Sequence, residues 1–441
     1  MIPTIFALAS GGGRAALSVY RLSGPAAGEV LRTLSGAELP APRLASLRTL
    51  RDRQGREIDK GLVLWFPGPA SFTGEDVVEL HLHGGRAVSQ AISAALLDFG
   101  LRPAEPGEFT RRAFEAGKLD LTQAEAIADL VDADTAAQRR QALAQLEGRL
   151  GRLYEGWRLE LLRAQAHLEA AIDFAEEDLP DDLILSSRTA LANLADRIAD
   201  HLADGGRGER LRDGLQVVLL GAPNAGKSSL LNLLAGREAA IVSATAGTTR
   251  DVIEVSLDLG GYPLLLADTA GLRDGAEEIE REGVRRARAR AEAADIKLVV
   301  LDGAEWPRLD GESLALLDER CLLLLNKVDL IGGSVPDTVE GRPVIAVSAS
   351  NGQGIDALLA ELTRAAEDRM AGDGAPALTR ARHRSALIDA AAALSRAQQQ
   401  TLPELVAEDV RVAARAIGRI TGRVDVEAML DIIFREFCIG K

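Results

Sequence analysis

The sequence is poor in the residues that build disulfide frameworks and membrane spans. It holds two cysteines, Cys321 and Cys438, too few for a disulfide scaffold or a cysteine-based zinc site, so a reducing compartment fits. No apolar run approaches the ~18 residues that a membrane span needs. No basic residue precedes the short apolar run in residues 1–13, so we expect no secretory signal. These absences favour a cytoplasmic protein without membrane contact.

Basic residues are outnumbered by acidic ones. The chain carries 66 Asp and Glu against 51 Lys and Arg, a net charge of −15, which argues against broad, non-specific nucleic-acid binding. A local RNA contact stays open. Only six basic residues are lysines, and genomic base composition is the simplest cause. Because arginine cannot replace a compact ammonium everywhere, Lys227 and Lys327, which fall in motifs, gain interest.

What is present suffices for several packed domains. The chain has 441 residues, of which 47% are hydrophobic, a length typical of two to four domains. Residues 77–83 alternate like a strand, and residues 86–99 have a helical pattern. From Leu143 to Leu168, apolar residues recur in steps of three and four, which predicts one face of a long helix. Further apolar strands are expected at 216–220, 264–267, 297–301, 321–325 and 344–347.

These patterns predict an α/β protein with a discontinuous helical domain. Strands that alternate with helices indicate a mostly parallel sheet, and glycine-rich stretches at 203–214 and 370–377 are expected to be linkers. A domain can be inserted where its ends lie close together. The expected order is an α+β N-terminal domain at 1–117, a first helical segment at 118–211, the inserted domain at 212–370 and a second helical segment at 371–441.

The strongest motif is GAPNAGKS at 221–228, which matches G-x-x-x-x-G-K-[ST]. It follows an apolar strand and precedes a helical pattern, the context that a P-loop requires and an accidental glycine-rich turn lacks. Its backbone N–H groups and the helix N-terminus favour phosphate binding. Lys227 is expected to reach the β- and γ-phosphates, and the Ser228 hydroxyl to ligate Mg²⁺. The other expected loop contacts come from Asn224, Ala225, Gly226 and Ser229.

Two further motifs address the same phosphates. Asp268-Thr269-Ala270-Gly271 ends an apolar strand, so Asp268 is expected in the Mg²⁺ shell and the Gly271 N–H near the γ-phosphate. Between this motif and the P-loop, Gly247-Thr248-Thr249-Arg250-Asp251 offers a switch-loop hydroxyl, and Thr249 is our choice as the second protein ligand of Mg²⁺.

The base is addressed by the last two motifs. Asn326-Lys327-Val328-Asp329 follows an apolar strand, and a carboxylate at Asp329 accepts two hydrogen bonds from the N–H edge of guanine. Adenine lacks that donor pair, so ATP would leave the carboxylate unpaired, and GTP is selected. Ser348-Ala349-Ser350 is expected to supply the last contact to the base.

One absence shapes the expected mechanism. Leu272 follows the DTAG motif and cannot orient an attacking water as the glutamine of Ras does. No arginine finger is identifiable by spacing, although Arg250 and Arg273 are candidates. The stretch 272–282 carries several carboxylates, and the ordinary role of such residues is a solvated helix start. Spacing alone therefore selects no catalytic residue among them.

Four stretches together resemble the MnmE (TrmE) family of tRNA-modification GTPases. They are PGEFTRRAFEAGKLDLTQAEAIADL at 106–130, PNAGKSSLLN with AGTTRD, DTAGLR, and FCIGK at 437–441. Ribosome-assembly GTPases also carry PNAGKSSLLN and GTTRD, so a ribosome-assembly GTPase acting as a binding switch is the alternative function. A GTP-binding scaffold without turnover is a third, against which the intact GTTRD and DTAG argue. The first and last stretches favour tRNA modification.

The resemblance implies partners and a cation. A flavoprotein of the MnmG (GidA) type, which uses FAD, would join this enzyme in adding a carboxymethylaminomethyl group at C5 of the wobble uridine of certain tRNAs. The chain would form a homodimer through its N-terminal domains. The inserted domain at 212–370 would be the GTP-binding G domain. Two G domains would pair and would need K⁺ in place of an arginine finger. The residues around K⁺ would be Asn224, Ser243, Thr245 and Thr248. The water-orienting glutamate of the family falls on Glu280.

The resemblance also implies a one-carbon donor, 5-formyl- or methylene-tetrahydrofolate. Its binding residues fall on Arg21, Glu79, Lys118 and the C-terminal Lys441. A carboxylate suits the N–H edge of a pterin, and cations suit the glutamate tail. Cys438 lies beside the chain end, and a catalytic role in the modification chemistry is a hypothesis whose alternative is a partly buried small apolar residue.

Overall fold

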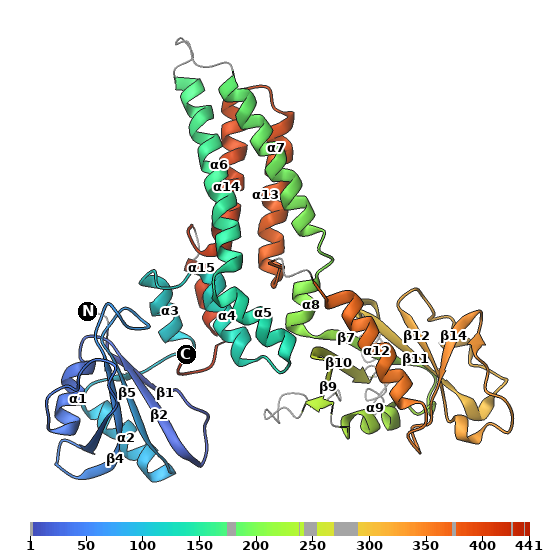
Figure 1. Ribbon diagram of the computed structural model, residues 1–441, viewed down its shortest axis with the longest axis horizontal. Helices are drawn as coiled ribbons and strands as arrows, with labels where there is room; N and C mark the ends of the chain where they lie inside the picture. Colours follow the sequence, from blue (N-terminus) through green and yellow to red (C-terminus); the bar gives the residue numbers. More distant parts are fainter. Residues whose placement is uncertain are drawn as a thin grey trace, which may run out of the picture. The chain divides into compact units, whose positions relative to one another are not determined.

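A computed structural model describes residues 3–173, 182–237, 239–241, 254–268, 290–372, 376–424, 427–435 and 437–441 (Figure 1). The chain forms two compact units, and each is assembled from separate stretches of sequence. The first unit comprises Met1–Ala128, Gln145–Ser187 and Gln399–Lys441. The second comprises Asp129–Ala144 and Arg188–Gln398.

A six-stranded sheet forms the N-terminal part of the first unit. Its strands lie in the order β3-β4-β5-β2-β1-β6, and only β1 and β6 pair in parallel among those pairs. The strands are β1 (Ile5–Leu8), β2 (Ala15–Ser23), β3 (Ser46–Arg51), β4 (Glu57–Phe66), β5 (Val77–Gly84) and β6 (Arg102–Pro103). Alternate residues such as Leu22, Leu80 and Trp65 pack one face against α1 (Ala27–Ser35) and α2 (Arg86–Asp98). The expected strand at 77–83 and helix at 86–99 are therefore present.

Helices complete the first unit. They include α3 (Glu108–Glu115), α4 (Leu121–Val131), α6 (Arg149–Asp173), α14 (Pro403–Thr421) and α15 (Glu427–Arg435). α6 buries Tyr154, Trp157 and Leu161, and it lies along α14, which comes from the other end of the sequence (Figure 1). Among the described helices, none combines the length and apolar character that a membrane crossing requires.

The C-terminal tail packs against the N-terminal sheet. The Gly107 N–H donates to the Cys438 carbonyl oxygen at 3.4 Å. Gly440 lies so close to the end of β1 that a Cβ there would stand 2.5 Å from the Leu8 carbonyl oxygen. Cys438 is exposed. The two ends of the sequence thus meet in one unit.

The second unit is built around an eight-stranded sheet. The strand order is β13-β14-β12-β11-β7-β10-β9-β8, with the run from β14 to β10 parallel and the flanking strands antiparallel. The strands are β7 (Leu215–Leu220), β8 (Ala240–Ile241), β9 (Glu254–Leu259), β10 (Tyr262–Asp268), β11 (Ile296–Asp302), β12 (Cys321–Asn326), β13 (Thr338–Val339) and β14 (Arg342–Ala346). The parallel strands bury both faces, as their continuous apolar runs predict.

Helices cover both faces of this sheet. On one face, α9 (Lys227–Ala235) and α12 (Ile355–Met370) share a core with Leu219 and Leu298, and Val218 and Leu325 belong to the core of the other face. The remaining elements are α5 (Ala136–Leu146), α7 (Asp182–Leu202), α8 (Arg207–Asp213), η2 (Gly303–Glu305), α11 (Gly311–Leu314), η3 (Val328–Leu330) and α13 (Ala381–Gln399). The expected fold class, a mostly parallel α/β sheet combined with a discontinuous helical domain, is confirmed.

Two expectations about helices were wrong. The apolar stripe from Leu143 to Leu168 is not one helix, because the chain breaks at Gly148 with a φ of 78° between α5 and α6, and Leu143 is exposed. The glycine-rich stretch 203–214 is not a plain linker, because it contains α8. That helix is held by ion pairs, including Arg210 Nε to Asp295 Oδ1 at 2.5 Å.

Candidate functional site

The loop between β7 and α9 takes a conformation that depends on glycine. Gly226 caps α9 with a φ of 91°, and Asn224 is also left-handed with a φ of 62°. A Cβ on Gly226 would lie 2.2 Å from Asn326 Nδ2. That amide nitrogen donates to the Ala225 carbonyl oxygen at 2.8 Å. The phosphate-binding motif and the base-binding motif are therefore packed directly on each other.

The polar side chains at the start of α9 are already oriented. Lys227 is buried, and its Nζ donates to the carbonyl oxygens of Gly221 and Ala222 at 2.8 Å each. The exposed Ser228 donates its hydroxyl to Asp268 Oδ2 at 2.6 Å. Asp268 ends β10, in register with Leu219 of β7. A hydroxyl and a carboxylate so close together are oxygen donors of the kind that Mg²⁺ takes.

The base-binding motifs form one hydrogen-bonded group at the end of β12. Asn326 accepts the Ala349 N–H at 3.0 Å on its Oδ1. The Ser350 hydroxyl donates to Asp329 Oδ2 at 3.2 Å and lies 2.9 Å from the Ser348 hydroxyl. A hydrogen bond from Ser348, supported by Ser350, holds the pKa of Asp329 below its usual value. Asp329 is exposed, so it presents an ionised carboxylate to solvent.

Sequence reasoning missed Asp302, which lies beside the base-binding motif and contacts Lys327. Lys327, left-handed with a φ of 61°, places its Nζ 2.6 Å from Asp302 Oδ2. Asp302 ends β11 just as Asp268 ends β10, so the pattern of an apolar strand followed by aspartate was the available signal. Ser229 lies exposed in the first turn of α9.

Several predicted site residues lie outside the described residues. They are Ser243, Thr245, Thr248, Thr249, Thr269, Ala270, Gly271 and Glu280, together with Arg250, Leu272 and Arg273. Within the described ranges, no three His, Cys, Asp or Glu side chains gather as a metal centre.

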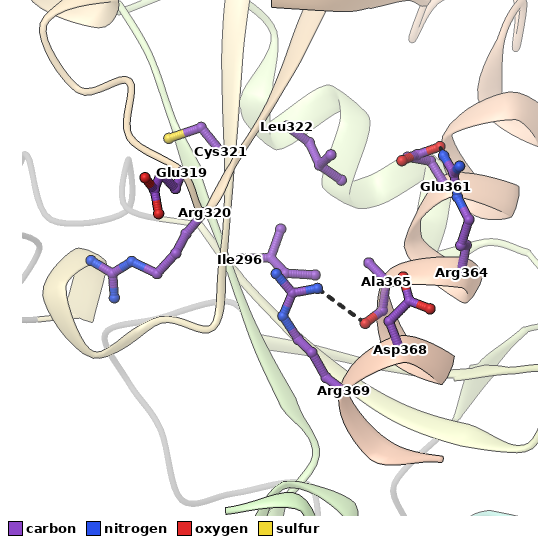
Figure 2. A pocket seen from close by; sticks show the side chains of 10 residues that line it. All are labelled: Ile296, Glu319, Arg320, Cys321, Leu322, Glu361, Arg364, Ala365, Asp368 and Arg369. Carbon is purple, nitrogen blue, oxygen red and sulfur yellow. Dashed lines mark hydrogen bonds and ion pairs between the residues drawn. The ribbon is translucent and has the colours of Figure 1, made fainter. Parts of the chain in front are cut away.

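A cavity of about 280 Å³ lies at the amino-terminal ends of two parallel strands of the same sheet, opposite the strand ends that carry the nucleotide motifs. It opens between the starts of β11 and β12 and the helix α12, whereas the P-loop follows the end of parallel β7. Figure 2 shows Ile296, Leu322 and Ala365 among charged side chains, with Arg369 Nη1 donating to the Ala365 carbonyl oxygen at 3.2 Å. None of the predicted site residues lines it, so it is separate from the nucleotide site.

A second polar site lies on the N-terminal sheet. Arg21 of β2 donates its Nε and Nη2 to Glu79 Oε1 of β5 at 3.2 and 2.9 Å. Glu79 Oε2 lies 3.3 Å from His81 Nε2, a neighbour that sequence reasoning did not single out. Oε1 already accepts both arginine donors, whereas Oε2 keeps a lone pair for a further donor, so the carboxylate fits a ligand that donates an N–H to Oε2.

The two lysines predicted for this site are not in direct contact with that pair. Lys118 Nζ donates to the Pro69 carbonyl oxygen at 2.5 Å. Lys441 follows Gly440 at the end of β1, whose Ala7 is the register partner of Arg21. In the part of the chain that the structure describes, neither ammonium bonds to Arg21 or Glu79.

Comparisons with known proteins extend over the whole chain. Family models described as "GTP-binding protein TrmE N-terminus" and "MnmE helical domain" match residues 4–118 and 121–438. The tRNA modification GTPase MnmE of Paramagnetospirillum magneticum is 62% identical over 441 residues, and that of Rhodospirillum rubrum 56% over 454, each covering 100% of both chains. Among solved structures, a variant of Era from Aquifex aeolicus is 24% identical with a TM-score of 0.28, covering 43% of this chain and 69% of that one.

Proposed function

The chain belongs to the MnmE family of tRNA modification GTPases, and we propose that it modifies C5 of the wobble uridine of certain tRNAs with a flavoprotein partner. The partner is of the MnmG (GidA) type and uses FAD, and the group added is carboxymethylaminomethyl. The full-length likeness to relatives named for tRNA modification supports this function over ribosome assembly, which needs neither the N-terminal domain nor the C-terminal FCIGK. The work on tRNA takes place in the cytoplasm.

The chain is a GTP-hydrolysing enzyme, and the edge of its eight-stranded sheet suggests how each motif contributes. The carbonyls of Gly221 and Ala222 hold the Lys227 ammonium at the P-loop, where it neutralises phosphate charge. Ser228 and Asp268 would hold Mg²⁺, which lowers the charge on the phosphate oxygens. Asp329, kept ionised by two serines, accepts the two N–H donors of guanine. The contact of Asn326 with the P-loop is the observation that carries this assignment.

Hydrolysis requires K⁺ and paired G domains in this proposal. Asn224 is an exposed residue of the P-loop with a left-handed backbone, and its side chain makes no hydrogen bond to the described part of the chain, so it can complete a cation site. Ser243, Thr245 and Thr248 supply the other oxygens, and Glu280 orients the attacking water, since Leu272 cannot. Replacing Glu280 by Ala should leave GTP binding intact and remove most turnover.

The deciding measurement is GTP turnover in KCl and in NaCl at equal ionic strength. We expect strong stimulation by K⁺ in the wild-type chain. The variant Asn224→Gly should lose that stimulation while it binds GDP normally, because glycine keeps the left-handed backbone and removes only the side chain. Equal rates in the two salts would refute the cation site and reopen both an arginine from the chain itself and the ribosome-assembly alternative.

The N-terminal domain is proposed to bind 5-formyl- or methylene-tetrahydrofolate and to form the homodimer. The Arg21–Glu79 pair supports the first role. For the second, the sheet face opposite α1 and α2 carries exposed Leu47 and Leu62, which are register partners on neighbouring strands. Clustered exposed apolar side chains mark interaction surfaces.

The nucleotide state has a physical route into the helical segments. The N–H of Ala137, at the start of α5, donates to the carbonyl oxygen of Gly261 at 3.1 Å. Gly261 lies in the turn between β9 and β10, and this hairpin separates the GTTRD loop from the DTAG motif. A change that GTP causes in those two motifs would therefore act on the hairpin that α5 contacts.

A further inference from the structure

An aromatic side chain is exposed on a loop whose backbone is held at both ends. Phe72, 38% exposed, lies in the segment between β4 and β5. The Gly68 N–H donates to Asp76 Oδ1 at 2.9 Å. The buried Thr73 hydroxyl lies 2.7 Å from the Ser23 hydroxyl. These contacts hold the loop in place, and the loop in turn sets the position of the Phe72 ring.

The ring lies beside the polar pair of the N-terminal sheet. Arg21 Cζ is 5.8 Å from the centroid of Phe72 and 5.8 Å from that of Phe109, within the range of a cation–π contact. Phe109 is fully buried, so it supports Arg21 from the core side and is out of reach of a ligand. Phe72 is the ring that a ligand bound to Arg21 and Glu79 can touch.

Lys118 fastens this loop. Its Nζ donates to the Pro69 carbonyl oxygen, and its stem passes Gly74, where a Cβ would lie 3.5 Å from Lys118 Cε. Gly74 has a φ of 79°, so the loop turns there in a conformation that favours glycine. The Lys118 ammonium, which was predicted to contact the ligand, therefore donates a hydrogen bond to the loop that carries Phe72.

We propose that Phe72 is the stacking residue of the N-terminal site and that Lys118 is a positioning residue that holds it beside Arg21 and Glu79. The ligand is a planar heteroaromatic ring that donates an N–H to Glu79 Oε2 while its face lies on Phe72. The proposal rests on the proposed use of a tetrahydrofolate, whose pterin has this chemistry. It adds a specificity residue and changes the role of Lys118 from ligand contact to loop latch.

The test for Phe72 is calorimetric titration of the full-length chain with 5-formyltetrahydrofolate. Loss of one stacking contact weakens binding by roughly 5- to 150-fold, the range that holds for bases on aromatic side chains. We expect this loss in Phe72→Leu and near wild-type affinity in Phe72→Tyr. The matched control is Phe99→Leu, since Phe99 also pairs with an arginine of this domain, Arg53, at 4.8 Å. Its affinity should not change.

The outcomes separate this inference from the function on which it rests. If wild-type chain binds no 5-formyltetrahydrofolate, the folate role and the stacking role both fail. If the wild-type chain binds it and Phe72→Leu binds equally well, only the stacking role fails.

The latch needs a second probe, a tetrahydropterin without the glutamate tail. If Lys118 acts through the loop, Lys118→Met weakens binding of both probes by the same factor. If Lys118 instead contacts the tail, the loss is confined to 5-formyltetrahydrofolate, and the latch is overturned. Thermal unfolding by circular dichroism, with an unchanged midpoint, ensures that the variant is folded.

Discussion

Replacing Gly226 by alanine should disable the nucleotide site through two separate effects. A residue with a Cβ at a φ of 91° costs about 1–2 kcal/mol. The new Cβ would also lie 2.2 Å from Asn326 Nδ2, so this buried amide must move. Asn326 would then lose its bonds to Ala225 and Ala349, worth about 0.5–1.5 kcal/mol each. Together the two effects destabilise the site by about 2–5 kcal/mol.

Binding of a fluorescent GDP analogue and thermal unfolding measure this loss. At 1.4 kcal/mol for each factor of ten, the affinity should fall by at least about 25-fold. The control, Gly236→Ala, is at the other end of the same helix, with a φ of −84° and no atom nearer than 3.5 Å to the new Cβ. It should be neutral or stabilise by up to about 1 kcal/mol. Equal behaviour of the two variants would refute the reasoning.

Three further outcomes are expected. A thiol reagent at pH 8 should modify the exposed Cys438 rapidly and Cys321 slowly, because burial raises the pKa of the Cys321 thiol, and a fast phase that survives Cys438→Ser would contradict this. Burial raises the pKa of Glu108, but hydrogen bonds from the Glu105 N–H and from two arginines outweigh burial and lower that pKa below 4.5. The ionised Glu108 carboxylate therefore stabilises the fold fully above pH 4.5, and this stabilisation is lost as the pH falls through the lowered pKa. Acid unfolding of Glu108→Gln, followed by circular dichroism, should lack this pH-dependent loss. Finally, Arg384→Met removes the ion pairs that tie Asp204 and Glu209 of the stretch 203–214 to α13, so trypsin should cleave within that stretch faster, and unchanged cleavage would argue against the tie.

Much of the fold could be predicted from the sequence because its elements follow local rules. The five parallel strands of the second unit are continuous apolar runs, as burial on both faces demands, and each lies within two residues of its predicted position. The nucleotide motifs were legible for a related reason. A P-loop needs glycines at fixed positions after a strand, and the structure shows why at Gly226, where no Cβ fits.

The remaining features depend on tertiary contacts that no short pattern contains. α8 reads as a linker because its residues are charged and flanked by glycines, yet its ion pairs come from distant segments such as Asp295 and Arg384. The break at Gly148 is hidden because apolar spacing continues on both sides of it. Lys118 was predicted as a ligand contact from the family resemblance alone, and its hydrogen bond to the Pro69 carbonyl oxygen has no signature in the sequence.

The pairing of α6 with α14 joins two segments that the ribosome synthesises at very different times. Leu161 and Leu168 of α6 leave the ribosome about 240 residues before the start of α14, the helix along which α6 lies. At 5–20 residues per second, that interval lasts roughly 10–50 s. During it, the apolar stripe of α6 has no permanent partner, while the nucleotide-binding sheet is made whole and can fold. The nascent chain therefore completes its nucleotide-binding sheet before α6 meets its partner, and the pairing of α6 with α14 forms last.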